Sequence, residues 1–114
     1  MKNLERKIVF ITGASSGIGK SCAVEFAKLK ANLILTARRE ERLKDLANEL
    51  EQKYNIKALC SKIDVRNYED VENMYNKLSD DWKKIDILIN NAGLARGLDK
   101  FYTGRLSDWN EMID

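Results

Sequence analysis

Thr12-Gly13-Ala14-Ser15-Ser16-Gly17-Ile18-Gly19 is the stretch that decides the fold of this chain. Before it, residues 7–12 form a short apolar run rich in β-branched side chains, which is typical of a strand covered on both faces. After it, apolar residues recur every three or four positions through residues 17–30, which predicts an amphipathic helix. The apolar face expected for this helix contains Ile18, Cys22, Phe26 and Leu29. The stretch is therefore a glycine-rich turn between a buried strand and a helix.

A turn of this kind is suited to binding a diphosphate. Glycine allows the backbone to adopt positive φ or to contact a ligand closely, and a helix start offers unpaired N–H groups and a positive dipole end to an anion. The glycines and N–H donors expected at this site are Gly13, Ser15, Ser16, Gly17, Ile18 and Gly19. Gly19-Lys20-Ser21 also resembles the end of a P-loop, but that pattern requires a glycine where this chain has Ala14. Phosphoryl transfer is therefore not favoured.

Strand and helix patterns alternate along the rest of the chain. Apolar runs at residues 32–36, 57–63 and 85–89 predict strands, and helical spacing at residues 40–53 and 68–82 predicts helices. This alternation indicates a parallel sheet with right-handed crossovers. We therefore expect an α/β, Rossmann-type three-layer αβα fold with a parallel sheet, in one domain over residues 1–114, truncated after the fourth strand.

The pattern changes after this last strand. Residues 90–106 show no clear period and hold three glycines, which indicates a loop. Ser107 is a suitable cap for a final helix, with Asp108 in its first turn. A strand at residues 85–89 with no further neighbour would form an apolar sheet edge. We therefore expect the isolated chain to be marginally stable, to self-associate, or to complete itself with another chain.

Composition excludes several classes of function. The 20 basic and 18 acidic side chains are interspersed, so the chain offers no basic stripe to nucleic acid or to an anionic membrane. No apolar run approaches the ~20 residues of a membrane helix, and the first residues lack the apolar stretch of a signal peptide, so a cytoplasmic protein is expected. The absence of histidine excludes Ser-His-Asp and Cys-His catalysis. Cys22 and Cys60 are too far apart to form a metal ligand pair, and no metal site is expected.

Three motifs resemble those of the short-chain dehydrogenase/reductase family. The first is TGxxxGxG, matched at residues 12–19; the second is NNAG, matched by Asn90-Asn91-Ala92-Gly93; the third is the pair Asp64-Val65 after the third strand. The resemblance covers essentially the whole chain. It implies hydride transfer between a nicotinamide cofactor and a small-molecule alcohol or carbonyl substrate. It also implies that Asp64 accepts a hydrogen bond from the adenine amino group, and that Asn90 ties the central strands together. The residues it places along the adenosine ribose are Asn91, Ala92 and Gly93.

The end of the second strand indicates which cofactor is bound. NAD-preferring folds place an acid there to bind the ribose hydroxyls, whereas this chain has Thr36-Ala37-Arg38-Arg39. No carboxylate repels a 2′-phosphate, and Arg38 and Arg39 are available to pair with it. We therefore predict that the cofactor is NADP. The alternative is that both arginines merely begin the next helix and face water.

The family resemblance implies catalysis by a Ser, a Tyr and a Lys, the last two in a YxxxK pattern, usually helped by an Asn. None of the four tyrosines is followed four positions later by a lysine, and the corresponding Asn would lie past Asp114. No catalytic residue is therefore assigned within this chain, and hydride transfer by the chain alone is expected to be negligible. The sequence at residues 90–96, with Asp108-Trp109 and Glu111, is most similar to family members that act on 3-hydroxy acids such as serine.

Two functions stay open on these grounds. The first is an NADP-dependent alcohol dehydrogenase or carbonyl reductase, of which this chain is the cofactor-binding portion; full-length relatives are usually dimers or tetramers, so a homo-oligomer is expected. The second is a protein that binds a dinucleotide without catalysis, as a sensor or an assembly partner. Coding sequence with YxxxK beyond Asp114 would favour the first, and a natural stop there would favour the second.

Overall fold

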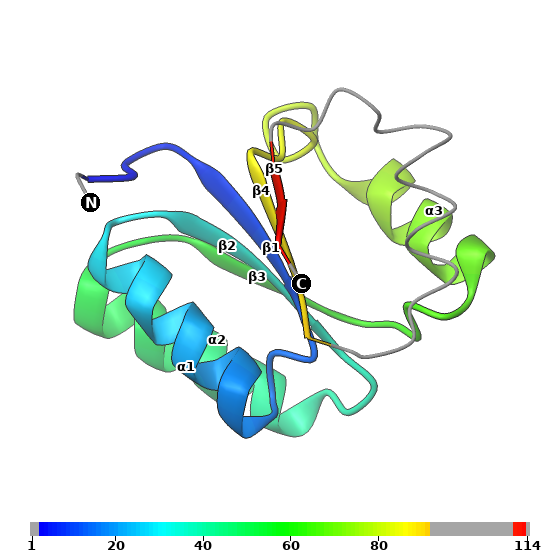
Figure 1. The fold of residues 1–114 in the computed structure, drawn as a ribbon, viewed down its shortest axis with the longest axis horizontal. Helices are drawn as coiled ribbons and strands as arrows, with labels where there is room; N and C mark the ends of the chain where they lie inside the picture. The colour runs from blue at the N-terminus through cyan, green and yellow to red at the C-terminus, as the bar shows by residue number, and fades with distance from the viewer. Residues whose placement is uncertain (1–2, 92–110, 114) are drawn as a thin grey trace.

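The computed structural model describes residues 3–91 and 111–113, along which strands and helices alternate (Figure 1). The strands are β1 (Ile8–Thr12), β2 (Asn32–Ala37), β3 (Ala58–Lys62), β4 (Ile87–Asn90) and β5 (Glu111–Ile113). The helices are α1 (Gly17–Lys28), α2 (Glu41–Tyr54) and α3 (Tyr68–Lys77). The elements up to β4 lie where the hydrophobic pattern predicts them, within a few residues at each end.

The strands form one parallel sheet in the order β3-β2-β1-β4-β5. Helices α1 and α2 cover one face of this sheet, and α3 covers the other (Figure 1). The chain runs outward from β1 to β3 and then returns to the other side of β1, so the direction of winding reverses between β1 and β4. This is the strand order of a doubly wound, dinucleotide-binding sheet. The predicted Rossmann-type three-layer fold is confirmed.

The core lies on both faces of the central strands. Successive side chains of a strand point to opposite faces, so Val9 and Ile11 pack with the α1 and α2 layer, while Ile8 and Phe10 pack with the α3 layer. All residues of β1 are buried. Burying one large aliphatic side chain stabilises the fold by about 1.5–3 kcal/mol, which explains why a continuous apolar run specifies a central strand.

Helix α1 meets the sheet through small residues. Its buried residues are Gly19, Ala23 and Ala27, spaced four apart. The apolar face expected from sequence is not this face, since Ile18 is 71% exposed and Cys22 and Phe26 are only partly buried. Small side chains allow the helix backbone to lie close to the sheet, and that close approach decides which face of α1 is covered. The periodicity of the larger residues therefore gave the buried face only in part, because Cys22 and Phe26 still pack against the core.

The structure also corrects two expectations for the end of the chain. Residues 111–113, which we expected to be helical, form β5, while residues 107–110 lie outside the described part. β5 pairs with β4 in parallel, with Ile87 opposite Glu111 and Ile89 opposite Ile113. The prediction that β4 is an unpaired edge is therefore wrong. The sheet continues to a fifth strand that is too short to show a hydrophobic period in the sequence.

Candidate functional site

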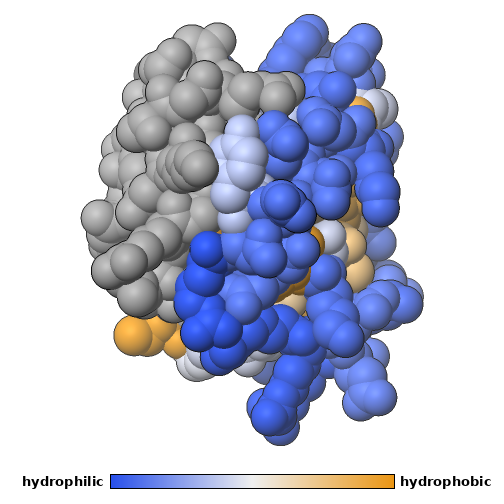
Figure 2. Space-filling model, turned by 90° about the vertical axis from the view of Figure 1, so that its right-hand side faces the viewer, coloured by the Kyte–Doolittle hydropathy of each residue, from blue (hydrophilic) through white to orange (hydrophobic). Residues whose placement is uncertain are grey.

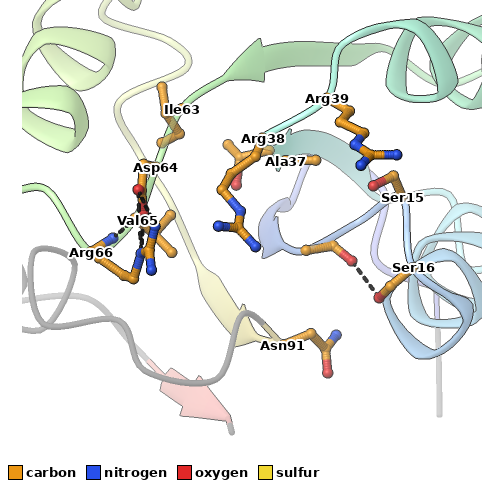
Figure 3. Close-up of a pocket in the computed structure, with 12 residues that line it drawn as sticks. Ser15, Ser16, Ala37, Arg38, Arg39, Ile63, Asp64, Val65, Arg66 and Asn91 are labelled. Carbon is orange, nitrogen blue, oxygen red and sulfur yellow. Dashed lines mark hydrogen bonds and ion pairs between the residues drawn. The ribbon is translucent and has the colours of Figure 1, made fainter.

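A cavity of about 580 Å³ opens at the carboxyl ends of the central strands. Its lining comes from the segments that follow β1, β2, β3 and β4, which a parallel sheet brings to one edge. The residues that line it are Gly13, Ser15, Ser16, Thr36, Ala37, Arg38, Arg39, Ile63, Asp64, Val65, Arg66 and Asn91. Figure 3 shows most of them around a common space. This volume lies in the range typical of small-molecule sites.

The turn after β1 is shaped by two glycines. Gly13 has φ 61°, a conformation that favours glycine, and its carbonyl oxygen accepts hydrogen bonds from Ser16 N at 3.2 Å and Ser16 Oγ at 2.8 Å. A Cβ added to Gly19 would lie 2.0 Å from the same carbonyl oxygen, closer than any side chain allows. Gly13 is therefore favoured by its backbone conformation, and Gly19 is required by the packing of α1 against the turn.

Neither packing nor backbone conformation requires glycine at position 17. A Cβ added there would meet no atom within 4 Å, and Gly17 does not have positive φ. The space in front of it is open, so the packing of the described residues does not require glycine at this position.

The N-terminus of α1 is left open to an anion. No side chain caps it, and its first turn contains no acidic residue. The start of α3 differs in both respects, because Asn67 accepts hydrogen bonds from Glu69 N and Asp70 N, and both of these residues are acidic. Capping and acidic first turns satisfy the free N–H groups and the dipole of a helix. α1 therefore keeps these groups available, next to Gly17.

Arg38 and Arg39 follow β2 and are exposed. Figure 3 shows the Arg38 guanidinium pointing into the cavity and that of Arg39 pointing toward Ser15. Among residues 3–91, neither arginine makes an ion pair with a carboxylate. Two guanidinium groups thus lie at the cavity with their donors available to an anion, and guanidinium is the side chain best shaped to bind carboxylate or phosphate.

Asp64 and Arg66 form an ion pair across from these arginines. Arg66 Nη2 lies 2.8 Å from Asp64 Oδ2, and Arg66 Nε lies 2.9 Å from Asp64 Oδ1. Hydrogen bonds from the guanidinium, together with one from the Arg66 backbone N–H, lower the pKa of Asp64 to about 2. The positive charge of Arg38 makes the smallest contribution to this lowering of the Asp64 pKa.

A buried hydroxyl joins β1 to β4. Thr12 is fully buried, and its Oγ1 donates to Asn90 Oδ1 at 3.0 Å and accepts from Asn91 N at 2.9 Å. This pair of bonds places Asn91 at the cavity and links the two strands between which the winding reverses. The expected role of Asn90 in tying the central strands together fits this geometry.

Comparison with known proteins identifies the family. A model of the family described as short chain dehydrogenase matches residues 7–114. The chain belongs to the short chain dehydrogenase family. A relative named NADP-dependent 3-hydroxy acid dehydrogenase, from Schizosaccharomyces pombe, is 46% identical over 114 residues, which are 99% of this chain and 44% of that protein. The chain therefore spans less than half the length of this short chain dehydrogenase.

Solved structures of similar sequence have the same fold. L-sorbose reductase from Gluconobacter frateurii, in complex with NADPH and L-sorbose, is 37% identical with a TM-score of 0.74, and the match covers 80% of this chain and 35% of that one. An oxidoreductase from Haemophilus influenza with bound NAD is 35% identical with the same TM-score of 0.74, over 81% of this chain and 32% of that one. Of these two similar structures, one thus holds NADPH and the other NAD.

Most of the residues predicted from the dehydrogenase motifs meet at the cavity. Those that line it are Gly13, Ser15, Ser16, Arg38, Arg39, Asp64, Val65 and Asn91. Gly17 and Ile18 instead line a shallow groove along α1, and Gly19 is buried beneath Gly13. Ala92 and Gly93 lie outside the described residues. The lining residues not predicted as contacts are Thr36, Ala37, Ile63 and Arg66.

Arg66 is the charged lining residue that the sequence reasoning missed. It stands two positions after Asp64, and its backbone N–H donates to Asp64 Oδ1 at 3.0 Å, as in a turn closed by an aspartate side chain. An Asp-x-Arg sequence directly after a strand was the available signal, because such a turn carries the arginine back toward the carboxylate.

The face drawn in Figure 2 is mostly hydrophilic, with small apolar areas between charged side chains. Across the described ranges 3–91 and 111–113, every helix is too short or too polar to cross a membrane. In the same ranges, no three His, Cys, Asp or Glu side chains are grouped so as to hold a metal ion.

Arg66→Ala is expected to raise the pKa of Asp64 from about 2 toward 3.8, because it removes the guanidinium that stabilises the charged carboxylate. With a folded-state pKa below that of the unfolded chain, the pair stabilises the fold above the unfolded pKa of about 3.9, and this contribution is lost as pH falls toward about 2. The measurement is the carboxyl carbon chemical shift of Asp64 against pH. An identical titration curve in the variant would contradict the assignment, and Arg6→Ala is the control.

Proposed function

We propose that this chain is the NADP(H)-binding domain of an NADP(H)-dependent oxidoreductase of the short-chain dehydrogenase type. The observation that carries the proposal is a pair of features at one cavity. Ser16, at the uncapped start of α1, lines one side, and Arg38, whose guanidinium has no ion-pair partner among the described residues, lines the other. Both are suited to phosphate, and a dinucleotide with a 2′-phosphate carries phosphate at two separate places.

The residues present fit such a cofactor along its whole adenosine half. The diphosphate would lie against Gly17 and the first turn of α1, with Ser15 and Ile18 nearby, where the chain leaves open space. The adenine ring would lie toward Asp64 and Val65, and Asn91 would face the ribose, continuing into Ala92 and Gly93. The nicotinamide of this cofactor, when bound, accepts or donates the hydride. What the described residues contribute is binding and orientation.

NADP is favoured over NAD by charge. The lining residues include three arginines and a single carboxylate, that of Asp64, which is already paired with Arg66. No acidic residue stands at the end of β2, where an NAD-preferring sheet would bind the ribose hydroxyls. A charge-assisted bond from Arg38 to the 2′-phosphate would give roughly 10- to 100-fold discrimination, and less where water screens the pair. The name of the Schizosaccharomyces pombe relative, which includes NADP, agrees with this preference.

The substrate class we propose is a 3-hydroxy acid, such as serine, or the corresponding carbonyl compound. Its support is the relative from Schizosaccharomyces pombe, whose name specifies this class and which is 46% identical over nearly the whole of this chain. The family resemblance further favours a homo-oligomer in the cytoplasm. The alternative, a non-catalytic dinucleotide-binding module, is not favoured by the similarity to dehydrogenases.

The first test is a calorimetric titration of the protein with NADP⁺ and with NAD⁺ at matched concentration. NADP⁺ is expected to bind roughly 10-fold or more tightly, because only NADP⁺ has a 2′-phosphate for Arg38. Combining Ala37→Asp with Arg38→Ala is expected to reverse the preference, since it supplies a carboxylate to the ribose and removes a phosphate ligand. Binding of neither dinucleotide by the parent protein would refute the proposal.

Alanine substitutions at Gly17 and Gly19 are expected to distinguish an effect on ligand binding from an effect on folding. Gly17→Ala is expected to leave the melting temperature within a few degrees of the parent and to weaken NADP⁺ binding by at least about 10-fold, because its methyl group meets only the space reserved for the diphosphate. Gly19→Ala is expected to lower the melting temperature, because its Cβ would overlap the Gly13 carbonyl. Full NADP⁺ affinity in Gly17→Ala would show that the diphosphate lies elsewhere.

Catalysis is tested on the full-length protein. Incubated with NADP⁺ and a series of 3-hydroxy acids that includes serine, it is expected to form NADPH, measured by near-ultraviolet absorbance. Acids hydroxylated at other positions are the matched controls. Tight NADP⁺ binding without reduction of the cofactor by any hydroxy compound would favour the non-catalytic module.

A further inference from the structure

Arg66 binds the only carboxylate among the described residues that line the cavity. The pair is bidentate: Nη2 lies 2.8 Å from Asp64 Oδ2, and Nε lies 2.9 Å from Oδ1 and 3.2 Å from Oδ2. The backbone N–H of Arg66 adds a further hydrogen bond to Oδ1 at 3.0 Å. Two parallel N–H···O bonds to a carboxylate fix its orientation as well as its charge.

The local turn builds this geometry into the backbone. Asn67 N donates to Asp64 O at 2.9 Å, which closes the turn, and Asp64 N donates to Asp70 Oδ2 in the first turn of α3 at 3.2 Å. Asn67 also caps α3, so both ends of the short segment are held. Most exposed ion pairs contribute little because two long side chains must be ordered. Here Asp64 and Arg66 are held two residues apart by the turn, which reduces that cost.

Arg38 lies in the same cavity as the ion pair between Asp64 and Arg66. Its guanidinium points into the space between Asp64 and the turn after β1, and its charge acts on the Asp64 carboxyl (Figure 3). Two cations, Arg38 and Arg66, therefore line the same cavity as one carboxylate. In this structure Arg66 holds both carboxylate oxygens, and Arg38 makes no ion pair with any of the described residues.

We propose that Arg66 is a specificity-determining positioning residue, which holds Asp64 so that Arg38 stays available for the 2′-phosphate of the ligand. This inference rests on the proposed NADP(H)-binding function. Without Arg66, Asp64 becomes an unpaired anion at the cavity. It then attracts Arg38 and repels the incoming phosphate dianion. The contact of Asp64 with adenine is common to ligands with and without the 2′-phosphate. The effect of Arg66 therefore falls on discrimination between them.

The test uses adenosine 2′,5′-bisphosphate and adenosine 5′-monophosphate, which occupy only the adenosine half of the site and differ by the 2′-phosphate. Binding of each is measured by calorimetry. Arg66→Ala is expected to weaken binding of the bisphosphate by about 5- to 10-fold and binding of the monophosphate by less than about 2-fold. Retained binding of the monophosphate also shows that the variant is folded.

The decisive variant is the double substitution Asp64→Asn with Arg66→Ala. It removes the carboxylate that would capture Arg38, so the discrimination of the parent protein is expected to return. A purely structural role for Arg66 predicts no such rescue. Arg66→Lys keeps the charge but not the bidentate geometry. Its preference for the bisphosphate over the monophosphate is expected to lie between that of the parent and that of Arg66→Ala. Arg6→Ala removes a guanidinium from the opposite end of the strands and is expected to change the affinity for neither ligand.

The outcomes separate this inference from the function on which it rests. If the parent protein does not prefer the bisphosphate, the proposed NADP(H) site fails. If the parent prefers it but Arg66→Ala keeps the same preference, only the role of Arg66 is overturned. Equal loss of both ligands in Arg66→Ala, without rescue by Asp64→Asn, also overturns that role.

Discussion

The close approach of α1 to the turn after β1 is the constraint on which the rest of the structure depends. The Gly13 carbonyl occupies the space that a side chain on Gly19 would need, and Ala23 and Ala27 continue the same closely packed row along the helix. A larger residue in this row would push α1 away from the sheet and carry its N-terminus away from the cavity. The packing that stabilises the first βα unit is thus the same packing that places the uncapped start of α1 beside the turn after β1.

The second organising feature is the distribution of charge at the carboxyl ends of the strands. A parallel sheet gathers the segments after β1, β2, β3 and β4 at one edge, so arginines and an aspartate distant in sequence share one cavity. Within that cavity Arg66 pairs with Asp64, while Arg38 makes no ion pair with any residue that the structure describes. The buried Thr12 hydroxyl fixes β4 and Asn91 relative to this cavity. The cavity lining is therefore positively charged although the chain as a whole has a net charge of only +2.

Local patterns predicted most of the fold and failed in identifiable places. The strands and helices up to β4 were predicted because each is a run of apolar residues long enough to show a period. β5 was missed because Glu111–Ile113 is too short for one, and a capping signal at Ser107 suggested a helix instead. The buried face of α1 was predicted only in part, because alanine and glycine carry little hydrophobic signal although they decide the close packing. Most site residues were predicted by motif spacing, whereas Arg66 belongs to no such motif.

The sequence by itself determined the alternation of strands and helices, the glycine turn, and the absence of an acid after the second strand. These are properties of neighbouring residues, and local chemistry specifies them. The tertiary structure alone decided that Arg66, and not Arg38, binds Asp64. It also decided that Gly19 is needed for packing, whereas Gly17 faces open space. The reason is physical: which cation reaches a carboxylate, and which glycine meets a neighbour, depends on distances between segments that only the folded sheet brings together.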